Sequence, residues 1–390
     1  MCYTAQCMVM LDPMVSTASL HSIRLFYAAY FATMGIILPF FPVYLAGRGM
    51  DAAAIGLFTG LLAISRVLAP PLAGRALDRS SDASRFILVA SLAAAILALL
   101  LPWIESSVAL ALAVLTFGCL WAVVLPLTDG LSVAVSEAAL VDYGRLRVWG
   151  SIGFVAASLA GGIWLAGENQ FRFPYWLAAT LLVTALAARG FPANTIQQER
   201  ASSHKKYFSS SFGLLLLVSF LMQASHGAYY GFYSLYLLKA GYEGWMIGGF
   251  WVLGAIAEIV LMWKWSRPVG EAAPALILSA CLFLASVRWL GIGLTQVWWL
   301  LILLQLLHAA SFAAFHVNAV TWVSRLSPHG RQVSAQGWYS ASGFGLGTAL
   351  GIMACGWISA QSGTSGFQMA FMACAVVALL GVPVALRLRT

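Results

Sequence analysis

The chain has 390 residues, of which 61% are hydrophobic and only 9% are charged, and its formal net charge is +8. Ordinary soluble domains carry about 25% charged residues. This composition therefore excludes a cytosolic enzyme, a secreted disulfide scaffold and a nucleic-acid-binding module. A membrane-spanning helix needs about 20 mostly apolar residues. The length thus suffices for twelve such helices joined by short loops, with little left for a soluble domain.

Apolar stretches of span length recur along the chain, and each predicts one transmembrane helix. They cover residues 22–46, 52–73, 86–104, 107–129, 147–167, 173–190, 209–238, 245–265, 274–293, 296–322, 333–358 and 366–386. The longest polar stretch divides these spans into six and six. We therefore expect a cytoplasmic tail at 1–21, a six-helix bundle at 22–190, a cytoplasmic linker at 191–207 and a second bundle at 208–390.

The distribution of lysine and arginine predicts the orientation. With the N-terminus inside the cell, cytoplasmic segments hold sixteen of these residues and outer loops hold three. Arg145 and Arg147 are counted among the sixteen. Cytoplasmic loops of membrane proteins carry an excess of Lys and Arg, so we expect both termini in the cytoplasm and the chain in a bacterial inner membrane.

The first half of the chain repeats in the second half. At an offset of 192 residues, positions 32–66 align without a gap with 224–258 and share 12 identities in 35. An offset of 190 aligns Gly153 with Gly343 and Gly161 with Gly351. Parallel six-helix halves with a substrate site between them are typical of secondary transporters. The spacing of four between Gly343, Gly347 and Gly351, and between Gly153, Ala157 and Gly161, also indicates close packing of the eleventh and fifth spans.

Several motifs resemble those of one transporter family. The run G-R-A-L-D-R at 74–79 is similar to the G-x-x-x-D-R signature of the major facilitator superfamily, although Ser80, Ser81 and Asp82 replace its usual Gly-Arg-Lys continuation. The runs D-Y-G-R-L-R-V-W-G-S-I-G-F at 142–154, Q-A-S-H-G-A-Y-Y at 223–230 and Q-L-L-H at 305–308 resemble the phenylpropionate-permease group, relatives of lactose permease and the nucleoside–proton symporters.

The resemblance implies an all-α membrane protein with twelve helices in two pseudo-symmetric halves. It also implies a cytoplasmic gate at Gly74, Asp78 and Arg79. The partners would be a small solute, a proton and the lipid bilayer, and we expect a monomer. No cofactor is expected, and the cysteines and histidines lack the spacing of a metal site. No catalytic motif of an enzyme appears.

Four charged residues fall within or at the end of apolar spans, where charge is costly and commonly functional. They are Arg66, Asp129, Glu258 and Arg288. Glu258 is the first candidate for proton coupling, because a carboxyl that alternates between an apolar site and a nearby cation would bind and release a proton. A constitutive ion pair is the alternative. Arg66 and Arg288 suit either an anionic solute or structural pairing, and Asp129 suits a gate or cap better than a proton carrier.

Polar and aromatic residues recur at helical spacing in two spans. In 209–238, the stripe predicted to line a cavity and bind solute consists of Gln223, His226, Tyr229, Tyr230 and Tyr233. In 296–322, a second stripe consists of Gln305, His308, Phe312 and His316. His308 is the next proton candidate, since histidine titrates near neutral pH. Interhelical packing is the alternative for both stripes.

These observations predict a proton-coupled importer of a small organic solute, with an aromatic carboxylate such as phenylpropionate favoured. Import of a nucleoside or sugar, proton-driven drug export, and a receptor that binds solute without transport remain open alternatives.

Overall fold

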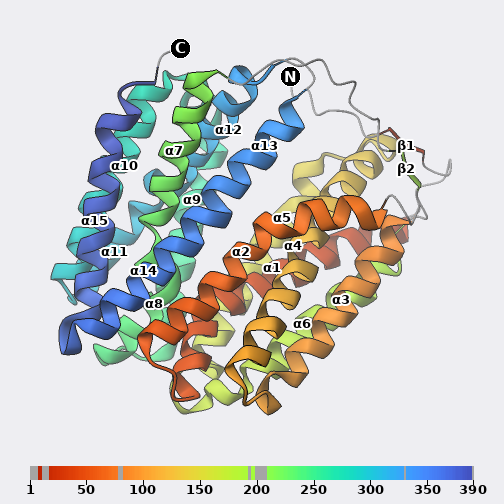
Figure 1. The fold of residues 1–390 in the computed structure, drawn as a ribbon. Coiled ribbons are helices and arrows are strands. Elements are labelled where there is room, and N and C mark those ends of the chain that lie inside the picture. The colour runs from red at the N-terminus through yellow and green to blue at the C-terminus, as the bar shows by residue number, and fades with distance from the viewer. Residues whose placement is uncertain are drawn as a thin grey trace. The chain divides into compact units, whose positions relative to one another are not determined.

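The computed structural model describes residues 8–10, 17–77, 82–191, 195–197, 209–328 and 331–388. Within these ranges, twelve helical segments are long and apolar enough to cross a membrane. They coincide with the twelve spans expected from hydrophobicity, and the all-α fold is confirmed (Figure 1).

Six segments come from the first half of the chain. Their helices are α1 (Thr17–Gly47), α2 (Ala52–Leu77), α3 (Ala83–Leu100) with the short 3-10 helix η1 (Leu101–Trp103), α4 (Ser107–Ala138), α5 (Tyr143–Trp164), and η2 (Gly167–Arg172) followed by α6 (Phe173–Ala188). Side chains of Asp82, Ser106 and Asp142 accept hydrogen bonds from backbone amides at the starts of α3, α4 and α5. These polar residues therefore set where the helices begin.

The second half forms the other six segments, and three of them are interrupted. Its helices are α7 (Ser210–Ala224) and α8 (Gly227–Lys239), α9 (Gly244–Glu271), α10 (Pro274–Leu294), α11 (Trp298–Leu306) with η3 (Ala309–Ala314) and α12 (Phe315–Leu326), α13 (Gln332–Ser340) with η4 (Ala341–Gly347) and α14 (Thr348–Gln361), and η5 (Gly363–Ser365) with α15 (Gly366–Ala385). Both η3 and η4 are π-helical. Such wide turns inside α-helices are rare and occur frequently at functional sites.

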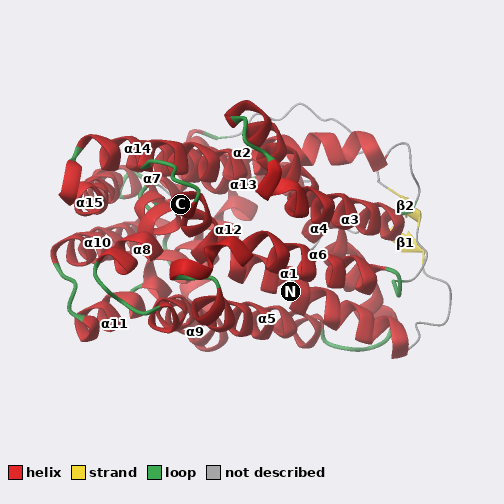
Figure 2. Cartoon of the chain, turned by 90° about the horizontal axis from the view of Figure 1, so that it is seen from below, coloured by secondary structure: helices red, strands yellow, loops and turns green. Residues whose placement is uncertain are grey.

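Two short strands, which hydrophobicity did not predict, accompany the helices. Strand β1 (Met8–Met10) pairs antiparallel with β2 (Thr195–Gln197), with Val9 opposite Ile196 (Figure 2). They fall in the predicted tail and linker, most of which lie outside the described residues.

Contacts between Cα atoms divide the chain into two compact units. Unit 1 comprises Met1–Phe41 and Leu68–Arg200, and unit 2 comprises Pro42–Val67 and Ala201–Thr390. The segment 42–67 belongs to unit 2, where Gly56 of α2 lies against Gly356 of α14. The division into two bundles at the 191–207 linker, which follows from the longest polar stretch, stays a prediction.

The internal repeat is visible in local geometry. The turns after α1 and α8 each contain a glycine with positive φ, at Gly49 (+78°) and Gly241 (+85°). Each turn is closed by the same six-to-one backbone hydrogen bond, from Met50 to Leu45 and from Tyr242 to Leu237. Glycine adopts this left-handed conformation without the steric cost of a Cβ. The positions differ by 192, as the sequence alignment predicts.

The small-residue packing predicted for the fifth and eleventh spans is confirmed. In unit 1, a Cβ on Gly153 would overlap the carbonyl oxygen of Ala28 on α1. In unit 2, a Cβ on Gly351 would overlap the carbonyl oxygen of Ala224 on α7. Each unit thus brings equivalent helices into backbone contact at glycine, which positions the side chains of those helices closely.

Candidate functional site

His308 joins the two charged side chains that the sequence singled out in the second half. Its Nε2 lies 2.7 Å from Oε1 of Glu258 on α9. Its Nδ1 lies 2.7 Å from a terminal nitrogen of Arg288 on α10. A guanidinium can only donate hydrogen bonds, so Nδ1 accepts and Nε2 carries the proton that is donated to Glu258. The imidazole is therefore neutral in this arrangement, and its tautomer follows from its neighbours.

The guanidinium of Arg288 is fully enclosed. The residue is 0% exposed, and its terminal nitrogens also donate to Ser311 Oγ at 3.1 Å and to Gln305 Oε1 at 2.5 Å. Its central carbon lies 4.5 Å from the ring centre of Tyr229 and 4.4 Å from that of Trp289, at cation–π distance. Within the described residues, no carboxylate contacts Arg288 directly. Its nearest balancing charge is Glu258, one imidazole away.

Local sequence explains why these groups meet. Gly254 precedes Glu258 by one helical turn on α9, and a Cβ there would lie 3.0 Å from the ring of His308. Glycine therefore leaves room for the imidazole beside the glutamate. On the partner span, α11 ends at Leu306 and the π-helical η3 begins at Ala309. This change in helical phase allows Gln305, His308 and Ser311 all to bond Arg288.

The residues of the stripe predicted on the seventh span contact several different neighbours. The chain breaks its helix between Ala224 and Gly227. Tyr229 packs on Trp251 at 4.5 Å between ring centres and accepts a hydrogen bond from Gln305 at 3.3 Å. Tyr233 also contacts Trp251, at 6.1 Å, and its hydroxyl is buried without a partner among the described residues.

The other members of that stripe face different neighbours. Nδ1 of His226 bonds the carbonyl oxygen of Met222 at 2.8 Å, and its ring stacks on Tyr230 at 5.5 Å. Tyr230 is half-buried and interacts electrostatically with both Glu258 and Arg66. Arg66 on α2, itself half-buried, is therefore within electrostatic range of Tyr230. Gln223 accepts a hydrogen bond from Thr348 of α14 at 3.4 Å and serves helix packing.

The end of the tenth-span stripe forms an aromatic cluster rather than contacting Arg288. Phe312 stacks on His316 at 6.0 Å, and both rings approach Phe344 in η4. Nδ1 of His316 lies 3.0 Å from the hydroxyl of Tyr339. These contacts join the two π-helical spans of unit 2 directly beside His308, whose ring lies 5.5 Å from Phe312.

Asp129 is the centre of a separate polar cluster in unit 1. Its Oδ1 accepts hydrogen bonds from Tyr27 at 2.6 Å and Tyr143 at 3.0 Å, and Arg147 Nε lies 3.8 Å away. The guanidinium of Arg147 also lies 4.2 Å from the ring centre of Phe31. The cluster connects α1, α4 and α5, and the expectation that Asp129 is a gate or cap rather than a proton carrier stays a prediction.

The partners of Asp129 do not follow from the sequence patterns. Arg147 counts among the cytoplasmic charges that predict orientation, and no pattern singles out Tyr27 or Tyr143. One sequence signal for this pairing is the position of Arg147 one turn after Tyr143 at the start of an apolar span.

Of the residues of the predicted gate, Asp78 and Arg79 lie outside the described residues. Gly74 is within α2.

Comparison with known proteins agrees with the fold. The model of the MFS_1 like family matches residues 20–371. The "Probable 3-phenylpropionic acid transporter" of Escherichia coli strain K12 is 32% identical over 313 residues, or 76% of this chain and 80% of that protein. The maltose permease of Geobacillus stearothermophilus is 27% identical over 83% of both chains. These relatives are transporters, not enzymes.

A solved structure shows the same architecture. The crystal structure of nucleoside transporter NupG superposes with a TM-score of 0.81 and 18% identity, covering 95% of this chain and 99% of that one. At this identity the likeness shows the fold alone.

Proposed function

We propose that this chain, which belongs to the MFS_1 like family of major facilitator superfamily transporters, is a proton-coupled symporter that imports a small aromatic carboxylate. The chain is a multi-pass membrane protein and a transporter of small solutes. Coupling to protons, the aromatic carboxylate and the direction of transport are the proposal. The contact chain Glu258–His308–Arg288 is the observation that carries it.

Charge balance gives this contact chain a coupling mechanism. With Glu258 ionised, its negative charge balances the buried Arg288 through the neutral His308. Protonation of Glu258 removes that charge and leaves a buried cation uncompensated, which is unfavourable in an apolar interior. A solute carboxylate that contacts Arg288 restores neutrality. Proton and carboxylate therefore enter together, and loss of the proton expels the anion.

Access to Arg288 requires one of its enclosing groups to move. His308 is the natural candidate, because it contacts both charges and weakens its hydrogen bond to Glu258 when that carboxyl is protonated. The ring would then leave the guanidinium free for the solute. In this scheme His308 transmits the protonation of Glu258 to Arg288 and does not itself carry the transported proton.

Aromatic side chains around Arg288 favour a planar solute. Tyr229 and Trp289 enclose the guanidinium, and Tyr230 is a more exposed ring within electrostatic range of Glu258 and Arg66. Aromatic faces stack on planar rings, and phenol hydroxyls bond polar edges. The relative with 32% identity is named as a probable 3-phenylpropionic acid transporter, which supports a solute with a carboxylate attached to such a ring.

Transport by purified protein in liposomes tests the coupling. With 3-phenylpropionate as the probe, wild-type protein should accumulate solute when an inward proton gradient is imposed. Glu258→Gln keeps the shape of the protonated acid but cannot release a proton, so solute exchange should continue while accumulation and proton uptake are lost. Glu271→Gln, an exposed glutamate on the same helix, serves as the matched control and should behave as wild type.

Other outcomes would redirect the proposal. Accumulation by a folded Glu258→Gln variant would refute proton coupling at this residue. Uptake of maltose or of a nucleoside such as uridine, in place of 3-phenylpropionate, would support the sugar or nucleoside alternative, since other relatives are named as a maltose permease and a putative nucleoside transporter. Drug resistance on overexpression would support export. Binding without exchange would indicate a receptor.

A further inference from the structure

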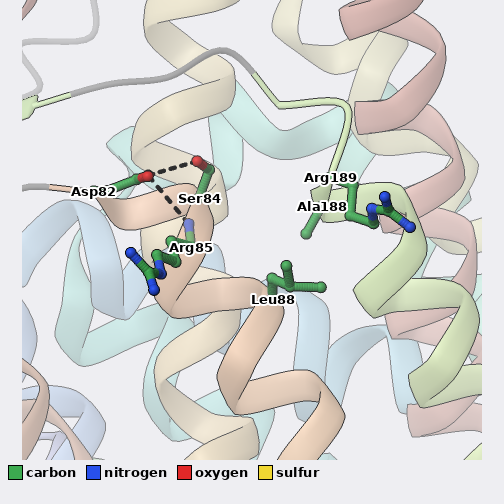
Figure 3. Close-up of a pocket in the computed structure, with 6 residues that line it drawn as sticks. All are labelled: Asp82, Ser84, Arg85, Leu88, Ala188 and Arg189. Carbon is green, nitrogen blue, oxygen red and sulfur yellow. Dashed lines mark hydrogen bonds between the residues drawn. The ribbon is translucent and has the colours of Figure 1, made fainter.

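A pocket in unit 1 has no part in the proposed transport mechanism. It lies between the start of α3 and the end of α6, with a volume of about 370 Å³ (Figure 3). Its lining residues are Asp82, Ser84, Arg85, Leu88, Ala188 and Arg189. Both helices belong to the same unit and pack along each other. The pocket is therefore formed by one pair of packed helices, where α3 begins and α6 ends.

Two arginines give the pocket a positive charge. Arg85 and Arg189 are exposed and lie on opposite sides of the pocket in Figure 3. Neither guanidinium forms an ion pair or a hydrogen bond with a residue of the described ranges. The long side chains are therefore available to a ligand from both sides of the opening.

The single acid of the pocket already has partners. Asp82 accepts hydrogen bonds from the Ser84 hydroxyl at 2.6 Å and from the Arg85 backbone amide at 3.1 Å, and so caps α3. The Ser84 hydrogen bond, the largest of several influences, lowers the pKa of the Asp82 carboxyl, which stays ionised at neutral pH. Two cations and one committed carboxylate leave the pocket with a net charge of +1.

Exposed apolar residues continue from the pocket toward the middle of the membrane. Val89, one turn after Arg85, is 57% exposed, and Ile96 two turns further along α3 is 59% exposed. On α6, Leu186 precedes Arg189 by one turn and is 58% exposed. The surface thus changes from cationic at the helix ends to apolar within about two turns, or roughly 10 Å.

We propose that this pocket binds an anionic glycerophospholipid, with the phosphate between Arg85 and Arg189 and the acyl chains along Val89, Ile96 and Leu186. Basic pockets between transmembrane helices are suited to anionic head groups. A soluble phosphate ester would use only the arginines, whereas a lipid also covers the apolar surface. The net charge favours an anionic head group over a zwitterionic one, whose ammonium finds only the occupied Asp82 carboxylate. This inference is independent of the proposed solute and coupling ion.

Native mass spectrometry of the full-length protein provides the test, with phosphatidylglycerol and phosphatidylcholine of identical acyl chains as probes. Wild-type protein should retain phosphatidylglycerol preferentially. In the Arg85→Gln/Arg189→Gln double variant, the ratio of retained phosphatidylglycerol to phosphatidylcholine should fall by about 10- to 30-fold, the effect of two arginines near an anionic lipid. Arg172→Gln, at the other end of the α6 segment, is the matched control and should keep it.

A charge-conserving variant and a soluble competitor complete the design. Arg85→Lys/Arg189→Lys should keep most of the preference, and this variant tests the site even if the glutamine variant fails to fold. Glycerol phosphate at millimolar concentration should not displace the lipid. Equal preference in the glutamine and wild-type proteins would overturn the proposal. Displacement by glycerol phosphate would indicate a soluble anion site instead.

Discussion

The energetic coupling between Glu258 and Arg288 can be measured by a double-mutant cycle. Contacts of 2.7 Å on each side of the His308 ring separate the two charged groups. With the width of an imidazole, the charges are roughly 7 Å apart, and at an effective dielectric constant of about 20 their attraction is worth about 2 kcal/mol. This is an upper value, because the Glu258 side chain is 21% exposed and solvent screens the charge.

We therefore expect Glu258→Gln and Arg288→Gln to destabilise the protein singly, and the double variant to be about 1–2 kcal/mol more stable than the sum of the single effects predicts. Each single change leaves one charge uncompensated, whereas the double change leaves neither. Reversible unfolding in mixed detergent micelles, followed by tryptophan fluorescence, measures each free energy.

An exposed ion pair on the same helix supplies the control. Arg267 and Glu271 lie 3.1 Å apart with side chains 87% and 56% exposed, and their coupling should not exceed about 0.5 kcal/mol. A coupling between Glu258 and Arg288 no larger than this control value would refute the argument that His308 connects the two charges.

Three further predictions concern packing, binding and orientation. Gly153→Ala should lower the free energy of unfolding by about 1–3 kcal/mol in the same assay, because its Cβ would overlap the α1 backbone, whereas Gly213→Ala, with open space around it, should not destabilise. Tyr230→Ala should weaken binding of 3-phenylpropionate by about 1–3 kcal/mol in calorimetry through loss of a ring contact, and unchanged affinity would exclude this ring from the site. An impermeant thiol reagent should label Thr364→Cys but not Ser202→Cys in intact cells, and the reverse pattern would contradict the expected orientation.

Much of the fold follows from local properties of the sequence, namely the length of its hydrophobic runs and the positions of its glycines. Hydrophobic length alone predicts the spans, because a bilayer requires about 20 apolar residues from every crossing helix. Glycines such as Gly49 and Gly241 mark equivalent turns, because the left-handed backbone there favours a residue without Cβ. The close approach at Gly153 and Gly351 is likewise readable, since small residues at a spacing of four make one smooth helix face.

The sequence predicts the residues of the candidate site only in part. Because burying a charge is costly, Glu258, Arg288 and Asp129 are identified as candidate functional residues from their positions in or at the end of apolar runs. The sequence treats Glu258 and His308 as successive candidates for one role, however, and the structure joins them by a 2.7 Å contact. It also separates His316 from that group and places it with Tyr339.

Such partnerships depend on tertiary structure, because helix rotation decides which side chains meet. A regular α-helix turns each residue by 100°, and the sequence stripes assume that regularity. The break between Ala224 and Gly227 and the π-helical turn after His308 change the phase, so the stripes divide among different neighbours. Charge counting places Arg147 among the cytoplasmic charges without a partner for a related reason. A sum of charges carries no information on pairing, and only the packing of α1, α4 and α5 brings that arginine to Asp129.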